Sequence, residues 1–96
     1  MLFILIATDK ENSLALRMAS REAHLAYARA TGVVRFGGPF LDAKGEMTGS
    51  MIVFEAADMD AARRWAGNDP YAKAGLFARS EIRAWKLTFN PNNIQL

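Results

Sequence analysis

The stretch VVRFGGPFLDAKGEMTGSMIVFE, residues 33–55, decides the fold. Two runs rich in β-branched and aromatic residues, 33–41 and 47–55, flank the polar segment DAKGE at 42–46. Such residues favour strands, and a short polar turn containing glycine between two strand-like runs is typical of a β-hairpin. The sequence therefore predicts an antiparallel hairpin in the middle of the chain.

A helix is predicted on each side of this hairpin. Residues 13–31 contain no Pro or Gly and are rich in Ala, Leu, Arg and Glu, which favour helix. Ser13 is a candidate N-cap, and Gly32 lies just past the expected helix end. The second helix is predicted over residues 58–66, starting at the first or the second aspartate of this stretch.

The first and the last strand are predicted near the two ends of the chain. Residues 1–8, MLFILIAT, are apolar and rich in strand-forming side chains, and a fourth strand is predicted from residue 78 or 80 to residue 89. The order β-α-β-β-α-β predicts a ferredoxin-like α+β fold, with a four-stranded antiparallel sheet and both helices on one face. Residues 90–96 form a C-terminal tail.

The strands also predict a second copy of the chain. A sheet with one face in water alternates apolar and polar residues, but MLFILIA at 1–7 and MIVF at 51–54 do not alternate. Two helices cover only one face, so we expect the other face to pack on the same face of a partner, giving a homodimer. The alternative is that short strands are simply apolar.

Size and composition narrow the class of protein. A chain of 96 residues suits one domain, residues 1–96, and the absence of cysteine excludes disulfides and thiolate sites and fits a cytoplasmic location. Twelve basic against ten acidic residues, with no charge run, argue against a nucleic-acid or membrane partner. The segment TGSMIVFE, residues 48–55, also lacks the aromatic spacing of RNA-recognition strands.

The only histidine, His24, lies in the first predicted helix. Helical spacing places it in one stripe with Arg17 and Arg21, and a cationic stripe beside an imidazole attracts an anionic small molecule. The alternative is a solvated helix face. No second histidine, HExxH motif or phosphate-binding loop is present, so no metal or cofactor is expected.

Asp69 stands before Pro70 in NDPYAKAGLF, residues 68–77, and Gly75 closes the segment. Asp is a favoured N-cap and Pro a favoured first helical residue, so this aspartate is predicted to cap a short helical turn. A fixed, ionised carboxylate is also suited to orienting a histidine. The capping role and a chemical role are therefore compatible.

The GGP segment interrupts the second strand. Glycine within a strand marks a bulge or a close backbone approach, which leaves room either for dimer packing or for a ligand over the sheet. We predict ligand contacts at Gly38 and Pro39, and at Ser50 on the neighbouring strand. A Ser-His-Asp triad with Ser50 is formally possible, but no nucleophile elbow supports it.

Four motifs in this order resemble the YciI-like proteins, the YCII-related domain family: HLAYARATG, GGPFLDAKGEMTGS, DPYAKAGLF and EIRAW. The resemblance extends from about Met1 to Trp85. It implies a ferredoxin-like unit of the dimeric α+β barrel superfamily, with His24 and Asp69 as the active-site pair and Arg17 as a further match. The family commonly carries Arg-Pro-Trp in the last strand, whereas Ala84 replaces the proline here.

The leading hypothesis is a small enzyme that needs no cofactor. His24 acts as general acid or base, Asp69 orients it, and Arg17 and Arg21 hold an anionic group. The expected reaction is elimination, isomerisation or dehydrohalogenation of a small organic acid. The alternatives are a haem-binding dimeric α+β barrel protein with His24 as axial ligand, and a non-catalytic module that binds a small ligand.

Overall fold

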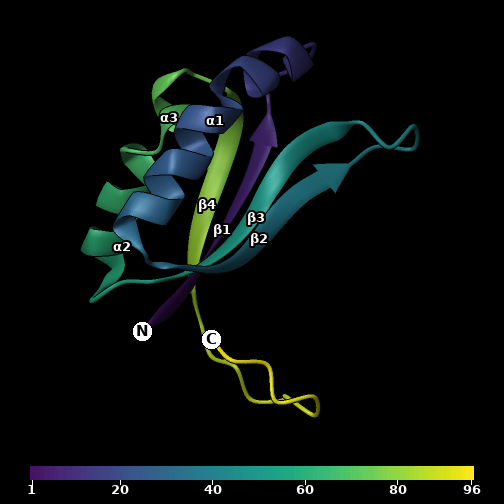
Figure 1. Ribbon diagram of the computed structural model, residues 1–96. Coiled ribbons are helices and arrows are strands. Elements are labelled where there is room, and N and C mark those ends of the chain that lie inside the picture. Colours follow the sequence, from purple (N-terminus) through teal and green to yellow (C-terminus); the bar gives the residue numbers. More distant parts are fainter.

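Four strands and three helices account for most of the chain, and the computed structural model describes all 96 residues. The elements are, in order, β1 (Leu2–Asp9), α1 (Leu14–Thr31), β2 (Val34–Leu41), β3 (Met47–Glu55), α2 (Met59–Gly67), α3 (Pro70–Lys73) and β4 (Phe77–Trp85). The strands form one antiparallel sheet in the order β2-β3-β1-β4, and the helices lie on one face of it (Figure 1). The predicted ferredoxin-like α+β fold is confirmed.

Ser13 and Gly32 flank α1 as predicted, but only Gly32 makes the expected capping contact. Gly32 follows the helix with φ of 66°, a left-handed conformation that suits glycine, and its N–H donates to the carbonyl of Ala28. Ser13 precedes the helix, but its side chain makes no capping hydrogen bond; its hydroxyl donates to the carbonyl of Glu11 instead. Ser13 therefore occupies the predicted N-cap position, but its side chain does not supply the capping hydrogen bond.

The two aspartates before α2 and α3 are true N-caps. An Asp58 carboxylate oxygen accepts the N–H of Ala61 at 2.8 Å, which selects Asp58 over Asp60 as the start of α2. An Asp69 carboxylate oxygen accepts the N–H of Tyr71 at 2.9 Å, with Pro70 as the first helical residue. The predicted cap at Asp69 is confirmed.

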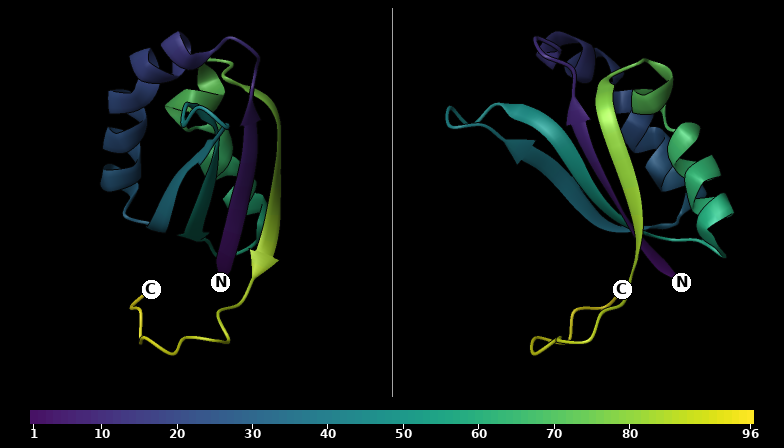
Figure 2. Two further views of the ribbon diagram at one scale, coloured as in Figure 1. Left: turned by 90° about the vertical axis from the view of Figure 1, so that its right-hand side faces the viewer. Right: turned by 180° about the vertical axis from the view of Figure 1, so that it is seen from behind.

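The last strand begins and ends earlier than predicted. β4 starts at Phe77 and ends at Trp85, not at residue 89. Trp85 pairs with Leu2, which is the first residue of β1, so beyond Trp85 no neighbouring strand remains to accept or donate hydrogen bonds. Residues 86–96 leave the sheet and project beyond its end as a tail (Figures 1 and 2).

The hydrophobic core lies between the sheet and α2. It is a cluster of buried side chains from β1, β3 and α2: Phe3, Leu5, Ile52, Phe54, Ala62 and Trp65. Phe54 and Trp65 stack with ring centroids 4.4 Å apart, and the Tyr27 hydroxyl donates to the carbonyl of Trp65. These contacts attach α2 to the sheet and α1 to α2. The β2–β3 hairpin curves away from α1 (Figure 1).

Two glycines allow neighbouring strands to approach closely. A Cβ at Gly49 would overlap the carbonyl oxygen of Ala7, and a Cβ at Gly37 would lie 2.9 Å from the carbonyl oxygen of Met51. A Cβ at Gly38, by contrast, would meet nothing within 4 Å. The predicted close backbone approach therefore applies to Gly37, while Gly38 faces open space.

The face of the sheet opposite the helices is uncovered (Figure 2). Because side chains alternate along a strand, the buried Phe3, Leu5 and Ala7 turn toward the helices and Ile4 and Ile6 turn away from them. Both isoleucines are half-buried. This open face is where the expected second copy would pack.

Candidate active site

His24 and Asp69 are in direct contact although they are 45 residues apart in sequence. The Nδ1 atom of His24 lies 2.9 and 2.8 Å from the two carboxylate oxygens of Asp69. Asp69 is fully buried, and the His24 side chain is 12% exposed. A carboxylate only accepts hydrogen bonds, so Nδ1 is the donor and Nε2 remains available to a ligand. The N-cap geometry of α3 holds the carboxylate in place.

Tyr71 completes the surroundings of the histidine. Its ring stacks on that of His24, with centroids 4.0 Å apart and planes inclined by 13°. The guanidinium carbon of Arg17 lies over the Tyr71 ring, 4.7 Å from its centroid. Burial raises the pKa of Tyr71 above its ordinary value of 10.0; the charges of Arg17 and Arg21 oppose this effect, and that of Asp69 adds to it.

Arg17 is not the solvated anion receptor that the cationic stripe suggests. It is 3% exposed, its Nε donates to Asp9 at 2.7 Å and its Nη2 to the same carboxylate at 3.2 Å. Nη2 also donates to the Ser50 hydroxyl oxygen at 2.6 Å. Asp9 therefore neutralises Arg17. Arg21, by contrast, is exposed and forms no ion pair.

A cavity of about 230 Å³ lies between α1 and the β2–β3 hairpin. The predicted site residues that line it are Arg17, Arg21, His24, Gly38, Pro39 and Ser50, and Asp69 lies behind His24. Apolar side chains, among them Leu25, Val34 and Ile52, form much of the remaining wall. The structure thus brings all seven predicted residues to one place.

Asp9 and Tyr71 belong to this site but do not stand out in the sequence. In the sequence, Asp9 is recognisable only as the residue that ends a strand. Its partner Arg17 is eight positions away in a different element, so the sequence does not reveal their contact. Tyr71 reads as one residue of a short helical turn. The only sequence feature that indicates a role for Tyr71 is its position two residues after Asp69 in DPY, because a residue at that distance from an N-cap lies beside the capping side chain.

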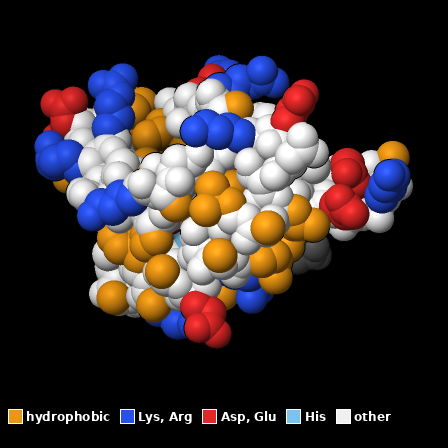
Figure 3. Space-filling model, turned by 90° about the horizontal axis from the view of Figure 1, so that it is seen from above, with side chains coloured by type: hydrophobic (Ala, Val, Ile, Leu, Met, Phe, Trp, Pro, Cys, Tyr) orange, Lys and Arg blue, Asp and Glu red, His pale blue; other side chains and the backbone are white.

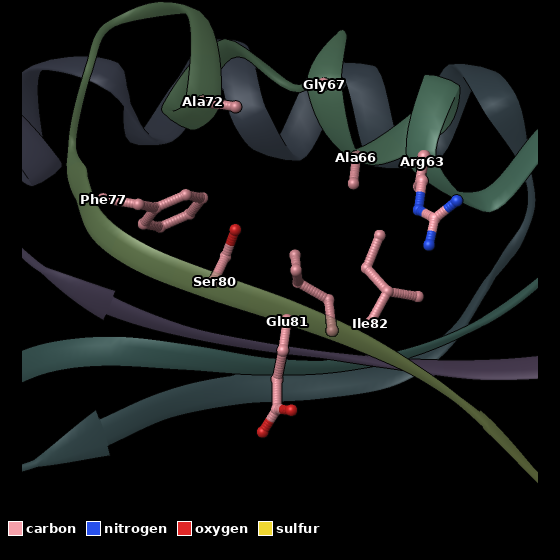
Figure 4. A pocket seen from close by; sticks show the side chains of 9 residues that line it. Arg63, Ala66, Gly67, Ala72, Phe77, Ser80, Glu81 and Ile82 are labelled. Atoms are coloured by element: carbon pink, nitrogen blue, oxygen red, sulfur yellow. The ribbon is translucent and has the colours of Figure 1, made fainter. Parts of the chain in front are cut away.

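A larger cavity of about 470 Å³ lies between α2, α3 and β4. Figure 4 shows Phe77 and Ser80 turned toward the helices, whereas the Glu81 carboxylate points away from the cavity. Its basic residue, Arg63, is largely exposed and lies 3.8 Å from Asp60. The smaller cavity is the better candidate because it alone combines a histidine, a carboxylate partner and buried polar groups.

The rest of the surface offers no comparable candidate site. Seen from above, hydrophobic side chains gather over the centre of the molecule, and Lys and Arg lie mostly around them (Figure 3). Nowhere do three or more His, Asp or Glu side chains gather in a metal-binding arrangement. None of the helices combines the length and the hydrophobicity that crossing a bilayer requires.

The sequence comparisons identify the family. The model of the YCII-related domain matches residues 1–86. Protein YciI of Escherichia coli O6:H1 is 33% identical over 98 residues, which cover 93% of this chain and 100% of that protein. The chain belongs to the YCII-related domain family, as its motifs indicate.

Solved structures share the fold of this chain. The 5-chloro-2-hydroxyhydroquinone dehydrochlorinase TftG from Burkholderia phenoliruptrix, in complex with 2,5-dihydroxybenzoquinone, is 38% identical with a TM-score of 0.83. The match covers 90% of this chain and 94% of TftG. A NIPSNAP family protein from Agrobacterium tumefaciens, 19% identical with a TM-score of 0.57, covers 96% of this chain and 97% of its own and shares the fold. The TftG similarity supports enzyme-like chemistry in this family.

Proposed function

We propose that this protein is a cofactor-independent enzyme that eliminates a leaving group from a small hydroxylated organic substrate, with His24 as the general base. The observation that carries the proposal is the contact of His24 Nδ1 with the buried carboxylate of Asp69, at 2.8 Å, beside a small cavity. This contact leaves Nε2 as the proton acceptor. It also stabilises the imidazolium that forms when a proton is taken up.

The proposed step balances without an oxidant or a reductant. His24 removes one proton from the substrate, and the electron pair left behind forms a new double bond within it. The leaving group, chloride in a dehydrochlorination, departs with the electron pair of its own bond to carbon. The substrate loses one proton and one chloride, and His24 later returns its proton to solvent.

The cavity favours a small, flat substrate with oxygen substituents. Its volume of about 230 Å³ lies below the ~300–1,000 Å³ of pockets for drug-sized ligands, and its wall combines apolar side chains with a few polar groups. TftG, named for the dehydrochlorination of a chlorinated hydroxyhydroquinone, supports this substrate class. Exposed Arg21 would attract the anionic form, while Gly38 and Pro39 form part of the wall.

The same pocket bears on the alternatives. A haem is larger than this cavity, so the pocket does not favour haem binding. A non-catalytic module would bind the same kind of ligand without converting it. Turnover, rather than binding, separates this alternative from the enzyme.

The test measures chloride release from 5-chloro-2-hydroxyhydroquinone, together with binding of 2,5-dihydroxybenzoquinone. We expect the wild-type protein to release chloride and the His24→Asn variant to release it roughly 10²–10⁴-fold more slowly. His24 does not enter the main core cluster, so the variant should remain folded. Binding without chloride release would identify a non-catalytic module, and equal rates for His24→Asn and wild type would disprove the role of His24.

A further inference from the structure

We propose that the larger cavity, between α2, α3 and β4, is a second ligand site that binds a small apolar carboxylate. We call it the α2–β4 cavity. It has no lining residue in common with the cavity that contains His24, so the inference does not depend on the proposed function. The ligand would place its apolar body between the helices and the sheet and its carboxylate beside Arg63.

The α2–β4 cavity has the size and the apolar wall that a small organic molecule requires. Its volume of about 470 Å³ lies within the ~300–1,000 Å³ of small-molecule pockets. The apolar side chains of its wall come from the sheet and from both helices: Leu5, Ala66, Ala72, Phe77 and Ile82. Figure 4 shows the Phe77 ring at one end and Ile82 toward the other. A hydrocarbon body can therefore contact apolar groups along the length of the cavity.

Small residues on the helices leave this space unfilled. Ala66 and Ala72 line it, and the Ala66 methyl group points toward β4 (Figure 4). Gly67 lines it too, although a Cβ there would meet nothing within 4 Å, so crowding does not require glycine at this position. Larger apolar side chains here would fill the space and add packing contacts. The cavity therefore exists because the sequence carries small residues where the helices face β4.

One charged side chain is directed toward the α2–β4 cavity, that of Arg63. Figure 4 shows its guanidinium extending from α2 toward β4 at the end opposite Phe77, whereas the Glu81 carboxylate points away. The Arg63 Nη1 atom lies 3.8 Å from Asp60, too far for a charge-assisted hydrogen bond of ~2.7–2.9 Å. The guanidinium therefore has donors available to a ligand, and its charge selects an anion.

Ser80 adds a neutral polar group between the two ends of the cavity. It pairs with Ala7 across β1 and β4, and its hydroxyl is turned toward the helices (Figure 4). A hydroxyl can donate and accept hydrogen bonds. One guanidinium and one hydroxyl suit a carboxylate, which accepts two parallel hydrogen bonds from an arginine. A phosphate dianion carries more charge, and the cavity directs no second cation toward it.

Tyr71 on α3 separates the α2–β4 cavity from His24. One side of its ring stacks on His24, and its edge-to-face partner is Phe77, with ring centroids 6.2 Å apart and planes inclined by 73°. Phe77 in turn lines the α2–β4 cavity. A ligand that packs on Phe77 therefore remains outside the His24 cavity, and the two sites can be tested separately.

The test uses 3-phenylpropionate and its uncharged counterpart 3-phenylpropanamide, with NMR of the nitrogen-15-labelled protein. We expect 3-phenylpropionate to shift the amide signals of Ala66, Gly67 and Ser80. Arg63→Gln should weaken its binding by roughly tenfold, the usual effect of losing a hydrogen bond between charged groups, and should leave 3-phenylpropanamide binding unchanged. Arg64→Gln is the matched control, because Arg64 is the next residue on α2, is exposed and does not line the cavity.

Ala66→Leu tests the cavity itself. It should fill the space and abolish binding of both probes, with folding checked by thermal melting; if it fails to fold, Arg63→Gln at an exposed position still decides. Equal 3-phenylpropionate binding by Arg63→Gln and Arg64→Gln would overturn the proposal, as would absent shifts or shifts confined to α1 and the β2–β3 hairpin. Failure of the proposed function is distinguishable, because it would appear as absent chloride release in a wild-type protein that still binds 3-phenylpropionate here.

Discussion

Asp9 and Arg17 form an ion pair that is buried on both sides. The Arg17 Nε atom lies 2.7 Å from an Asp9 carboxylate oxygen, and the two side chains are 5% and 4% exposed. The pair joins the last residue of β1 to the first part of α1, and Arg17 also donates a hydrogen bond to Ser50 on β3. The wall of the candidate site therefore depends on a buried charge with a single compensating partner.

Removing one member of this pair should destabilise the protein strongly. Asp9→Ala or Arg17→Ala leaves a buried charge uncompensated, and we expect each to lower the free energy of unfolding by about 3–5 kcal/mol. Urea denaturation followed by circular dichroism measures this loss. The double variant should cost clearly less than the two single variants added together, since neither charge then remains.

The exposed pair of Arg63 and Asp60 supplies the control. Their side chains are 68% and 80% exposed, so Arg63→Ala should change stability by less than about 1 kcal/mol. A similarly small effect of Arg17→Ala would contradict the buried ion pair and return Arg17 to the role of a solvated anion receptor.

Asp69→Asn should separate the capping role of Asp69 from its chemical role. Asparagine caps helices about as well as aspartate, so stability should change by less than about 1 kcal/mol. The amide no longer requires a proton on Nδ1 of His24, and the wrong tautomer then becomes populated. We expect nitrogen-15 NMR of the single histidine to show this change and chloride release to fall by roughly 10²–10⁴-fold.

Asp58→Asn is the matched control for this variant. Asp58 caps α2 through the N–H of Ala61 and has no contact with a histidine. It should leave the His24 nitrogen signals and the rate unchanged. If Asp69→Asn behaves in the same way, Asp69 is only a cap.

The two tyrosines should make the protein sensitive to alkali. Burial raises the pKa of Tyr27 and of Tyr71 above 10.0; the charge of Asp69 raises both further, and Arg17 and Arg21 partly oppose the shift at Tyr71. Above pH 10 the unfolded chain releases tyrosine protons that the folded chain retains. The tyrosine contribution to the free energy of unfolding is therefore intact below pH 10 and decreases as the pH rises further.

Absorbance of tyrosinate measures the ionisation of Tyr27 and Tyr71 directly, because the chain has only these two tyrosines. We expect the folded protein to show less than half of the tyrosinate signal at pH 10, and Tyr27→Phe and Tyr71→Phe to assign the two transitions. Half-ionisation of both tyrosines at pH 10 in the folded protein would show that neither phenol is protected.

The strand glycines should differ sharply in their tolerance of alanine. Gly49→Ala would push a methyl group into the carbonyl of Ala7, and Gly37→Ala would place one 2.9 Å from the carbonyl of Met51. We expect losses of about 1–3 kcal/mol or more for these variants, and less than about 1 kcal/mol for Gly38→Ala. Thermal melting checks the order, and equal effects at Gly38 and Gly49 would contradict the strand packing.

The open sheet face should mediate dimerisation. We expect light scattering after gel filtration to give about twice the chain mass of 10.6 kDa. Ile4→Lys places a charge on the open face and should produce monomers, whereas Met18→Lys, at a position on α1 that is 51% exposed, should not. A monomeric wild-type protein would rule out the second copy.

Local chemistry determined much of the fold from the sequence alone. The polar turn at 42–46 between two strand-like runs specifies the hairpin, and Asp69 before Pro70 specifies an N-cap, because both depend on residues within a few positions. The order of the strands and helices along the chain is then compatible with few sheet topologies. The resemblance of the motifs placed His24 and Asp69 together before any distance between them was known.

Only the tertiary structure decided which charges are free and where each element stops. Arg17 and Arg21 look alike on the helix, yet one is buried against Asp9 and the other is exposed, because Asp9 ends a strand that packs beside the start of α1. The last strand stops at Trp85 because its partner begins at Leu2. The stacking of Tyr71 on His24 likewise joins α3 to α1. Each of these outcomes depends on residues far apart in the chain, which local propensity does not encode.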